Sequence, residues 1–156
     1  MPALEDWNAR IRAEFRENAG YVPWSSPADL AAGRPIPPHM PGFPENGMPL
    51  LLVHHIGAKT GKTRISPLFY LPVGDHWAVF GTHGGSPRDP AWYRNLMANP
   101  RTVVEAGAGE IPVEARLTAG AERAGIWAEQ IARVPIFAEF EAVSGRQIPV
   151  VLLERR

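Results

Sequence analysis

The chain has 156 residues, 45% of them hydrophobic, and sixteen Lys and Arg residues balance sixteen Asp and Glu residues. This length fits one globular domain with a single core, and zero net charge gives no basic field for nucleic acid or an anionic membrane. Cysteine is absent, which excludes disulfides, thiolate metal sites and a cysteine nucleophile. Without a leader-like segment or a membrane-length apolar run, we expect a soluble, cytoplasmic protein with at most peripheral membrane contact.

Two segments precede the strand-rich part of the chain. An apolar stripe with helical spacing, from Leu4 to Phe15, predicts an amphipathic N-terminal helix in residues 1–19. Residues 20–48 are dense in proline, which disfavours helix interiors and central strands alike. Because this segment also carries large apolar side chains, we expect an ordered loop or lid over residues 49–156, with a disordered linker as the alternative.

Short runs rich in β-branched and aromatic residues follow, separated by turn signals. They predict six strands, in residues 49–56, 63–73, 76–83, 102–107, 111–118 and 148–154. Six short strands with a few helices predict a small, closed or nearly closed β-barrel, because closure removes exposed strand edges. The expected fold class is therefore mainly β with helices (α+β), in a single domain spanning residues 1–156.

Three helices are expected between these strands. In residues 89–100, Asp89 is expected as the N-cap and Pro90 in the first helical position. Residues 120–134 and 135–143 predict two more. The inward-facing residues expected in the helix at 120–134 are Ala124, Trp127, Ala128 and Ile131.

The only two lysines, Lys59 and Lys62, lie in a glycine-containing turn between the first two predicted strands, and Arg64 follows. Backbone N–H groups and three cations within one turn suit a phosphate. Solvated charges at a hairpin tip explain the same pattern. The segment GTHGGSPRDPAW, in which paired glycines lead into a helix N-terminus, also favours anions, and the two features together suggest a phosphorylated cofactor.

The histidines show no metal-ligand pattern. His54 and His55 are neighbours on a predicted strand, so their side chains point to opposite faces. No two of the five histidines have ligand spacing, and we predict no metal site. No carboxylate pair or Ser-His-Asp spacing suggests hydrolysis.

Several motifs together resemble a known family. GAKTGKTRISPLFYL, GTHGGSPRDPAWYRNLMANP and the ending IPVVLLE are similar, in order and spacing, to the deazaflavin-dependent nitroreductase family, split β-barrel proteins that use coenzyme F420. The resemblance covers residues 49–155, and WNARIRAEFRENAG is similar to the family's N-terminal helix. It implies a six-stranded, FMN-binding-like split β-barrel.

The resemblance also implies a set of site residues. For the phosphate and acidic tail of the coenzyme they are Lys59, Thr60, Gly61, Lys62 and Arg64. Around the deazaflavin ring they are Thr82, Gly84, Trp92, Tyr93 and Asn95, and His54 and Pro67 complete the cofactor-binding set. For the electron acceptor they are Phe69, Val134, Phe137 and Phe140.

Several positions depart from the family's pattern. A basic residue is usual at Ala58, so the expected tail site is weaker in charge. Small hydroxyl residues are usual at His54 and His55, and lysine is frequent at His83. The four acceptor positions hold Val and Phe where the best-known members have tyrosines, so hydroxyl donors to the acceptor are lost. The segment at 20–48 is longer than the family's usual link.

The function implied is a two-electron reduction, with hydride passing from reduced deazaflavin to a flat apolar acceptor such as a quinone, a nitroaromatic or an activated alkene. Thr82 is the candidate for a polar contact to the charge that develops during hydride transfer, and His83 or solvent is the candidate proton source. The alternative for both residues is a local hydrogen bond to the backbone. An FMN-dependent oxidoreductase, or a non-catalytic carrier of deazaflavin or an apolar ligand, is the alternative function. We expect a small-molecule partner, no nucleic acid, and a monomer or homodimer.

Overall fold

The computed structural model describes Ala9, Arg12, Ala13 and residues 50–107 and 109–156. The predicted lid at 20–48 lies outside the described residues, as does the predicted N-terminal helix apart from Ala9, Arg12 and Ala13, which are helical. Arg12 donates from Nη1 to the carbonyl oxygen of Ile65 at 3.1 Å. This hydrogen bond places Arg12 beside the second strand of the sheet.

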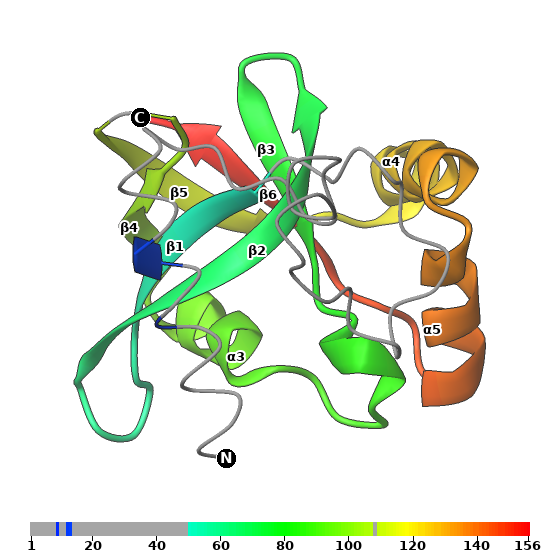
Figure 1. Ribbon diagram of the computed structural model, residues 1–156, viewed down its shortest axis with the longest axis horizontal. Helices are drawn as coiled ribbons and strands as arrows, with labels where there is room; N and C mark the ends of the chain where they lie inside the picture. Colours follow the sequence, from blue (N-terminus) through cyan, green and yellow to red (C-terminus); the bar gives the residue numbers. More distant parts are fainter. Residues whose placement is uncertain (1–8, 10–11, 14–49, 108) are drawn as a thin grey trace, which may run out of the picture.

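Six antiparallel strands form a closed barrel in the order β1-β2-β3-β6-β5-β4 (Figure 1). The strands are β1 (Leu50–Ile56), β2 (Thr63–Val73), β3 (His76–Phe80), β4 (Arg101–Glu105), β5 (Glu110–Leu117) and β6 (Val150–Arg155). Valine, isoleucine, leucine and aromatic residues dominate them, and such side chains pack well on a pleated surface. The predicted barrel and its α+β class are confirmed.

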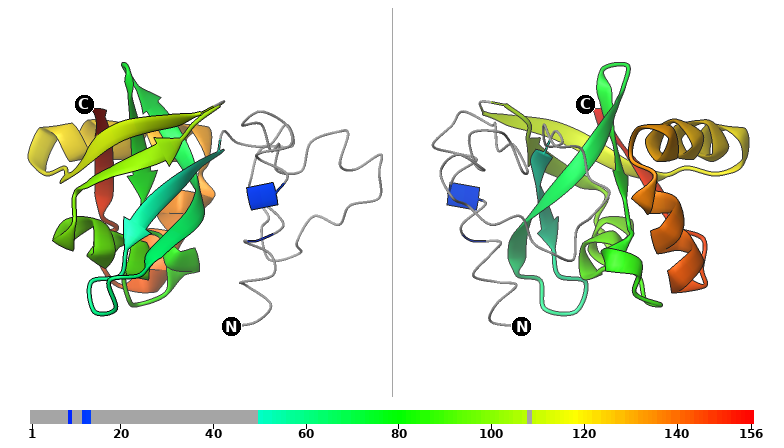
Figure 2. Two further views of the ribbon diagram at one scale, coloured as in Figure 1. Left: turned by 90° about the vertical axis from the view of Figure 1, so that its left-hand side faces the viewer. Right: turned by 45° about the vertical axis from the view of Figure 1, so that its right-hand side comes forward.

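The helices occupy two places around the barrel. α3 (Ala91–Ala98) lies at one end, whereas α4 (Gly120–Arg133) and α5 (Ile136–Ser144) lie together on one side (Figures 1 and 2). A 3₁₀ turn, η1 (His83–Gly85), follows β3 and contacts α5. Several of the predicted contacts lie on these elements, those to the coenzyme ring on η1 and α3 and those to the acceptor on α5.

The barrel has separate apolar cores inside and outside, as alternation along each strand requires. Inside, strand residues pack with the buried face of α3, which closes one end of the barrel. The main members are Leu51, Val53, Trp77, Val79, Trp92, Leu96, Val104, Val113, Val151 and Leu153. Outside, the β2, β3 and β6 face packs against α4 and α5. The main members are Leu71, Ala78, Phe80, Ile126, Trp127, Val134, Ile136, Phe137, Val150 and Leu152.

The predicted N-cap of α3 is wrong by one residue. The helix begins at Ala91 with Pro90 as the N-cap, so Asp89 lies outside the cap position. The Asp89 carboxylate instead accepts a hydrogen bond from Arg146 Nη1 at 2.7 Å. The predicted end of the helix at Asn99 is confirmed.

The predicted inward face of α4 is partly wrong. Trp127 is buried as expected, but the other buried residues are Ile126 and Gln130, while Ala124 and Ala128 are exposed. Burial of an isoleucine and a tryptophan removes more apolar area from water than burial of two alanines, so the helix is rotated toward the larger side chains.

The third predicted strand is also shorter than expected. β3 ends at Phe80, because the next residues leave the extended conformation and form η1. Inside η1, His83 and the two glycines after it have positive φ angles.

Candidate functional site

The turn between β1 and β2 is exposed and internally hydrogen bonded. The N–H of Gly57 donates to the carbonyl of Lys62, and the N–H of Gly61 donates to the carbonyl of Gly57, both at 2.8 Å. Lys59, Lys62 and Arg64 are exposed, and none of them forms an ion pair with the part of the chain that the structure describes. Five other arginines of that part are paired with carboxylates, so the turn differs in gathering three cations without a carboxylate partner among the described residues.

A buried polar network lies behind this turn. Asn95 of α3 accepts a hydrogen bond from the N–H of Ala58 through Oδ1 and contacts His55 Nδ1 through Nδ2, each at 2.9 Å. His55 Nε2 lies 2.9 Å from Ser66 Oγ on β2. The network joins the turn, both flanking strands and the helix that closes the barrel.

The protonation state of His55 follows from its partners. Asn95 must donate from Nδ2, since its Oδ1 already accepts from Ala58, so His55 Nδ1 is an acceptor and Nε2 carries the proton. The pKa of His55 is lowered to about 4, mainly because the ring is buried and to a smaller extent because of the nearby charges of Arg64 and His54. His55 is therefore a neutral structural link at physiological pH.

The loop after β3 is held by one arginine. Arg146, which follows α5, donates from Nε to the carbonyl of Ser86 at 3.0 Å and from Nη1 to Asp89 at 2.7 Å. Its Nη2 lies within 3.2 Å of the carbonyl oxygens of Gly81, Thr82 and Arg88. Arg146 was not predicted as a site residue, because nothing near it in the sequence indicates that it folds back on a loop about sixty residues away.

Within this loop, His83 has a constrained backbone and an oriented ring. Its φ angle of 46° is unusual for a residue other than glycine. Its Nδ1 lies 3.1 Å from the carbonyl oxygen of Arg88, to which it donates, so in the neutral ring Nε2 carries the lone pair. The side chain of Thr82 makes no capping hydrogen bond to η1. Both candidate catalytic residues therefore keep polar atoms that the loop itself does not use.

The four predicted acceptor residues are brought together on the outer face of the barrel. Val134 and Phe137 are buried there, and Phe69 and Phe140 pack against the same cluster. The ring centroids of Phe137 and Phe140 are 5.7 Å apart. A β-carbon at Gly85 would lie 3.6 Å from the carbonyl oxygen of Phe140, so η1 packs directly on this apolar wall.

One buried polar group lies on the same helix face. Gln130 of α4 is 1% exposed, and its Nε2 has no hydrogen-bond partner among the described residues. It follows Ile126 and Trp127 by about one helical turn and precedes Val134 by another, so it shares their face. This amide donor, without a partner in the described part of the chain, therefore borders an otherwise apolar cluster.

The ring-binding residues predicted on α3 lie at different depths. Trp92 belongs to the barrel interior, and Asn95 is engaged in the network behind the turn. Tyr93 is half-buried, and burial together with the charge of Asp89 raises the pKa of its phenol. Tyr93 also lines a cavity of about 270 Å³ between α3 and the start of α4. Of the three, Tyr93 is the least buried.

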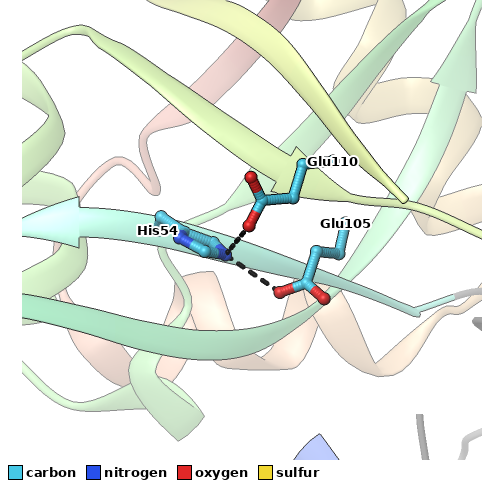
Figure 3. Close-up of side chains that lie close together, drawn as sticks. All are labelled: His54, Glu105 and Glu110. Carbon is cyan, nitrogen blue, oxygen red and sulfur yellow. Dashed lines mark hydrogen bonds and ion pairs between the residues drawn. The ribbon is translucent and has the colours of Figure 1, made fainter. Parts of the chain in front are cut away.

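His54 and Pro67, on β1 and β2, complete the predicted cofactor-binding set. His54 Nε2 lies 2.9 Å from Glu105 Oε2 and 4.0 Å from Glu110 Oε1 (Figure 3). Pro67 is half-buried and pairs with Leu52 across β1 and β2. The two carboxylates beside His54 would repel an anionic tail, which distinguishes its surroundings from those of the lysine turn.

The barrel with its cationic turn defines the class as a flavin-binding-like barrel protein. The model of the F420H(2)-dependent quinone reductase family matches residues 40–155. The F420H(2)-dependent quinone reductase Rv1261c of Mycobacterium tuberculosis is 35% identical over 122 residues, covering 75% of this chain and 78% of that protein. The chain therefore belongs to the F420H(2)-dependent quinone reductase family.

Solved structures agree with this assignment. A structure of an F420-H2-dependent reductase, FDR-A, is 36% identical with a TM-score of 0.62, and the match covers 68% of this chain and 94% of that one. A second structure, described as a domain-swapped dimer, has the same identity and TM-score and covers 68% of this chain and 80% of the other. The protein is thus an oxidoreductase of a family whose cofactor is coenzyme F420. Among the described residues, no helix is long and apolar enough to span a bilayer.

Proposed function

We propose that this protein reduces a quinone by two electrons, with reduced coenzyme F420 as the hydride donor, and that other flat, electron-poor molecules such as nitroaromatics and activated alkenes are further acceptors. Family membership supports the cofactor, and the apolar wall of Phe69, Val134, Phe137 and Phe140 supports a flat apolar acceptor. The Pro-rich segment and its predicted role as a lid are not needed for this proposal.

The observation that carries the proposal is the cationic β1–β2 turn, whose lysines and Arg64 form no ion pair within residues 50–107 and 109–156. Three exposed cations on a turn that is fixed by its own backbone and by Asn95 suit a phosphate and an acidic tail. Lys59, Lys62 and Arg64 would hold these anionic groups, together with the backbone N–H of Thr60, while the N–H of Gly61 keeps the turn closed through its bond to Gly57. The residues present therefore fit coenzyme F420.

The residues near η1 are assigned to the reaction. When bound, the reduced coenzyme supplies the hydride, and the protein orients both reactants and excludes water. Gly84 lets the loop approach a ring closely, and Tyr93 offers a neutral phenol beside it. Thr82 would hydrogen bond to the developing charge on the acceptor oxygen. His83 Nε2 would deliver a proton to that oxygen when the imidazole is charged.

A turnover assay tests the proposal. Purified protein is mixed with reduced coenzyme F420 and a water-soluble naphthoquinone, a nitroaromatic or an activated alkene, and the fluorescence of the oxidised coenzyme is followed. We expect protein-dependent recovery of the fluorescence, fastest with the quinone. Binding of the coenzyme without recovery with any acceptor would instead support a carrier, which the lack of acceptor-site hydroxyls would explain. A parallel titration with FMN measures the preference between the two cofactors.

A further inference from the structure

Three neighbouring strands bring a histidine and two glutamates together at one end of the barrel. His54 comes from β1, Glu105 ends β4 and Glu110 begins β5. Figure 3 shows the three side chains pointing toward one another. The imidazole Nε2 and one oxygen of each carboxylate all lie within 4.8 Å of one another.

The cluster combines one imidazole with two carboxylates. Glu105 and Glu110 are direct partners in the β4–β5 register, where like charges destabilise the strand pair. A neutral imidazole with two carboxylates gives a donor set of charge minus two, which a divalent cation matches. Magnesium and calcium take oxygen ligands, whereas a nitrogen donor with two carboxylates suits zinc or cobalt.

The distances suit such an ion after small side-chain rotations. With zinc–nitrogen and zinc–oxygen bonds of about 2.0–2.2 Å, tetrahedral ligand atoms are roughly 3.4 Å apart. The separations from His54 Nε2 are 2.9 Å to Glu105 and 4.0 Å to Glu110, which lie on either side of this value. The Glu110 side chain is 61% exposed, so it can rotate inward without disturbing the core. The remaining coordination position would hold water.

The cluster lies where the barrel closes. Among the described residues, β1 and β4 are paired through Leu52 with Glu105 and Val53 with Val104 alone, while β1 and β2 pair along the whole of β1. An ion held by His54 and both glutamates would cross-link β1, β4 and β5 across this short seam. Ligands carried on strands hold their geometry better than ligands on loops.

We propose that His54, Glu105 and Glu110 form a binding site for a divalent transition-metal ion, preferentially zinc, that stabilises the closure of the barrel. This proposal does not depend on the coenzyme or the acceptor. Its site uses a side chain assigned above to the cofactor, and the two carboxylates beside it favour a cation over an anionic tail.

The test uses the full chain after treatment with a chelator. Zn²⁺ or Co²⁺ alone is titrated calorimetrically, Co²⁺ binding is also followed by its visible absorption, and thermal unfolding is measured with and without each ion. We expect one equivalent to bind, with a higher Tm, and no displacement by excess Mg²⁺. Glu110→Gln should weaken Zn²⁺ binding at least about tenfold and abolish the Tm increase.

Glu114→Gln is the matched control, because Glu114 is another glutamate of β5 that pairs with Arg101 outside the cluster. It should bind Zn²⁺ as the unchanged protein does. The proposal is overturned if no saturable binding occurs, or if the two variants weaken binding equally. Because Glu110 is largely exposed, its variant is expected to fold, and circular dichroism of the metal-free proteins verifies this.

Discussion

Asn95 ties the cationic turn to the closed end of the barrel, because its Oδ1 accepts the N–H of Ala58 at 2.9 Å while its Nδ2 donates to His55. Asn95 is 7% exposed, so its side chain acts on the turn from behind. Both polar atoms of its side-chain amide therefore already have hydrogen-bond partners in the protein. We therefore regard Asn95 as a residue that positions Lys59 and Lys62, whereas the family resemblance assigns it to the coenzyme ring.

Replacing Asn95 by alanine should loosen the turn and destabilise the fold. Loss of the amide leaves Nδ1 of the buried His55 ring and the N–H of Ala58 without their partner, at a cost of about 1–3 kcal/mol in the free energy of unfolding. Coenzyme binding should also weaken. Urea denaturation and a fluorescence titration measure the two effects. Asn99→Ala, at the C-cap of the same helix, serves as the control, and unchanged coenzyme affinity in Asn95→Ala would argue against a positioning role.

The barrel was predictable because its signals are local. Each element is signalled by residues that are close together in the sequence: alternating side chains for the strands, glycines for the turns, and prolines at both ends of the helix in residues 91–98. All of these elements are found in the structure. The gathering of Phe69 with Val134 was expected only through the family resemblance. The face of α4 was mispredicted because spacing alone did not show that Gln130 would be buried.

The missed contacts join distant parts of the chain. Arg146 reaches the loop after β3, and His54 reaches two glutamates of a hairpin about fifty residues away. Their partners are set by barrel closure, which no local pattern encodes. The spacing of the histidines alone predicts no metal site, because these glutamates join His54 only in the folded barrel.

The turn itself is tested by removing its charges. Lys59→Ala and Arg64→Ala should each weaken coenzyme binding by roughly 1.5–3 kcal/mol, because charge-assisted hydrogen bonds to an anion are lost. Tm should barely change, since both side chains are exposed. Arg133→Ala removes an exposed cation from α4 and should not affect binding. Equal coenzyme affinity in the double variant and the unchanged protein would refute the assignment.

Arg146 should control the geometry of the loop that carries Thr82 and His83. Arg146→Lys keeps one positive charge but cannot supply the same planar set of donors to Asp89 and the loop carbonyls. We expect a loss of about 2–4 kcal/mol in stability and a larger fall in kcat than in coenzyme affinity. Steady-state kinetics and coenzyme titration separate the two effects. A proportional loss of both would indicate a general structural role.

The apolar wall is best tested at its less buried ring. Phe137 is 3% exposed and contacts Phe80, Trp127 and Phe140, so Phe137→Ala should cost about 3–5 kcal/mol of stability. Phe140 is only half-buried, so Phe140→Ala should cost less and raise the rate with bulky quinones relative to small ones. Rates with a matched pair of small and bulky quinones provide the measurement. An unchanged ratio would place Phe140 outside the acceptor site.

The depressed pKa of His55 predicts how stability depends on pH. The folded protein has a pKa of about 4 at this residue and the unfolded chain has 6.5, so as pH falls the unfolded state takes up the proton first. The contribution of His55 is therefore complete above pH 6.5 and is lost between pH 6.5 and 4, by up to about 3 kcal/mol.

Urea denaturation across this pH range, in the presence of a chelator, measures the contribution of His55. His55→Asn should be less stable at neutral pH but should show a smaller decline on acidification, because its side chain does not titrate. His76→Asn is the control, since His76 is only partly buried and lies at the other end of β3 from η1, and it should keep the decline of the unchanged protein. If His55→Asn declines as steeply as the unchanged protein, the acid sensitivity arises from other groups and His55 is not held neutral by the Asn95 network.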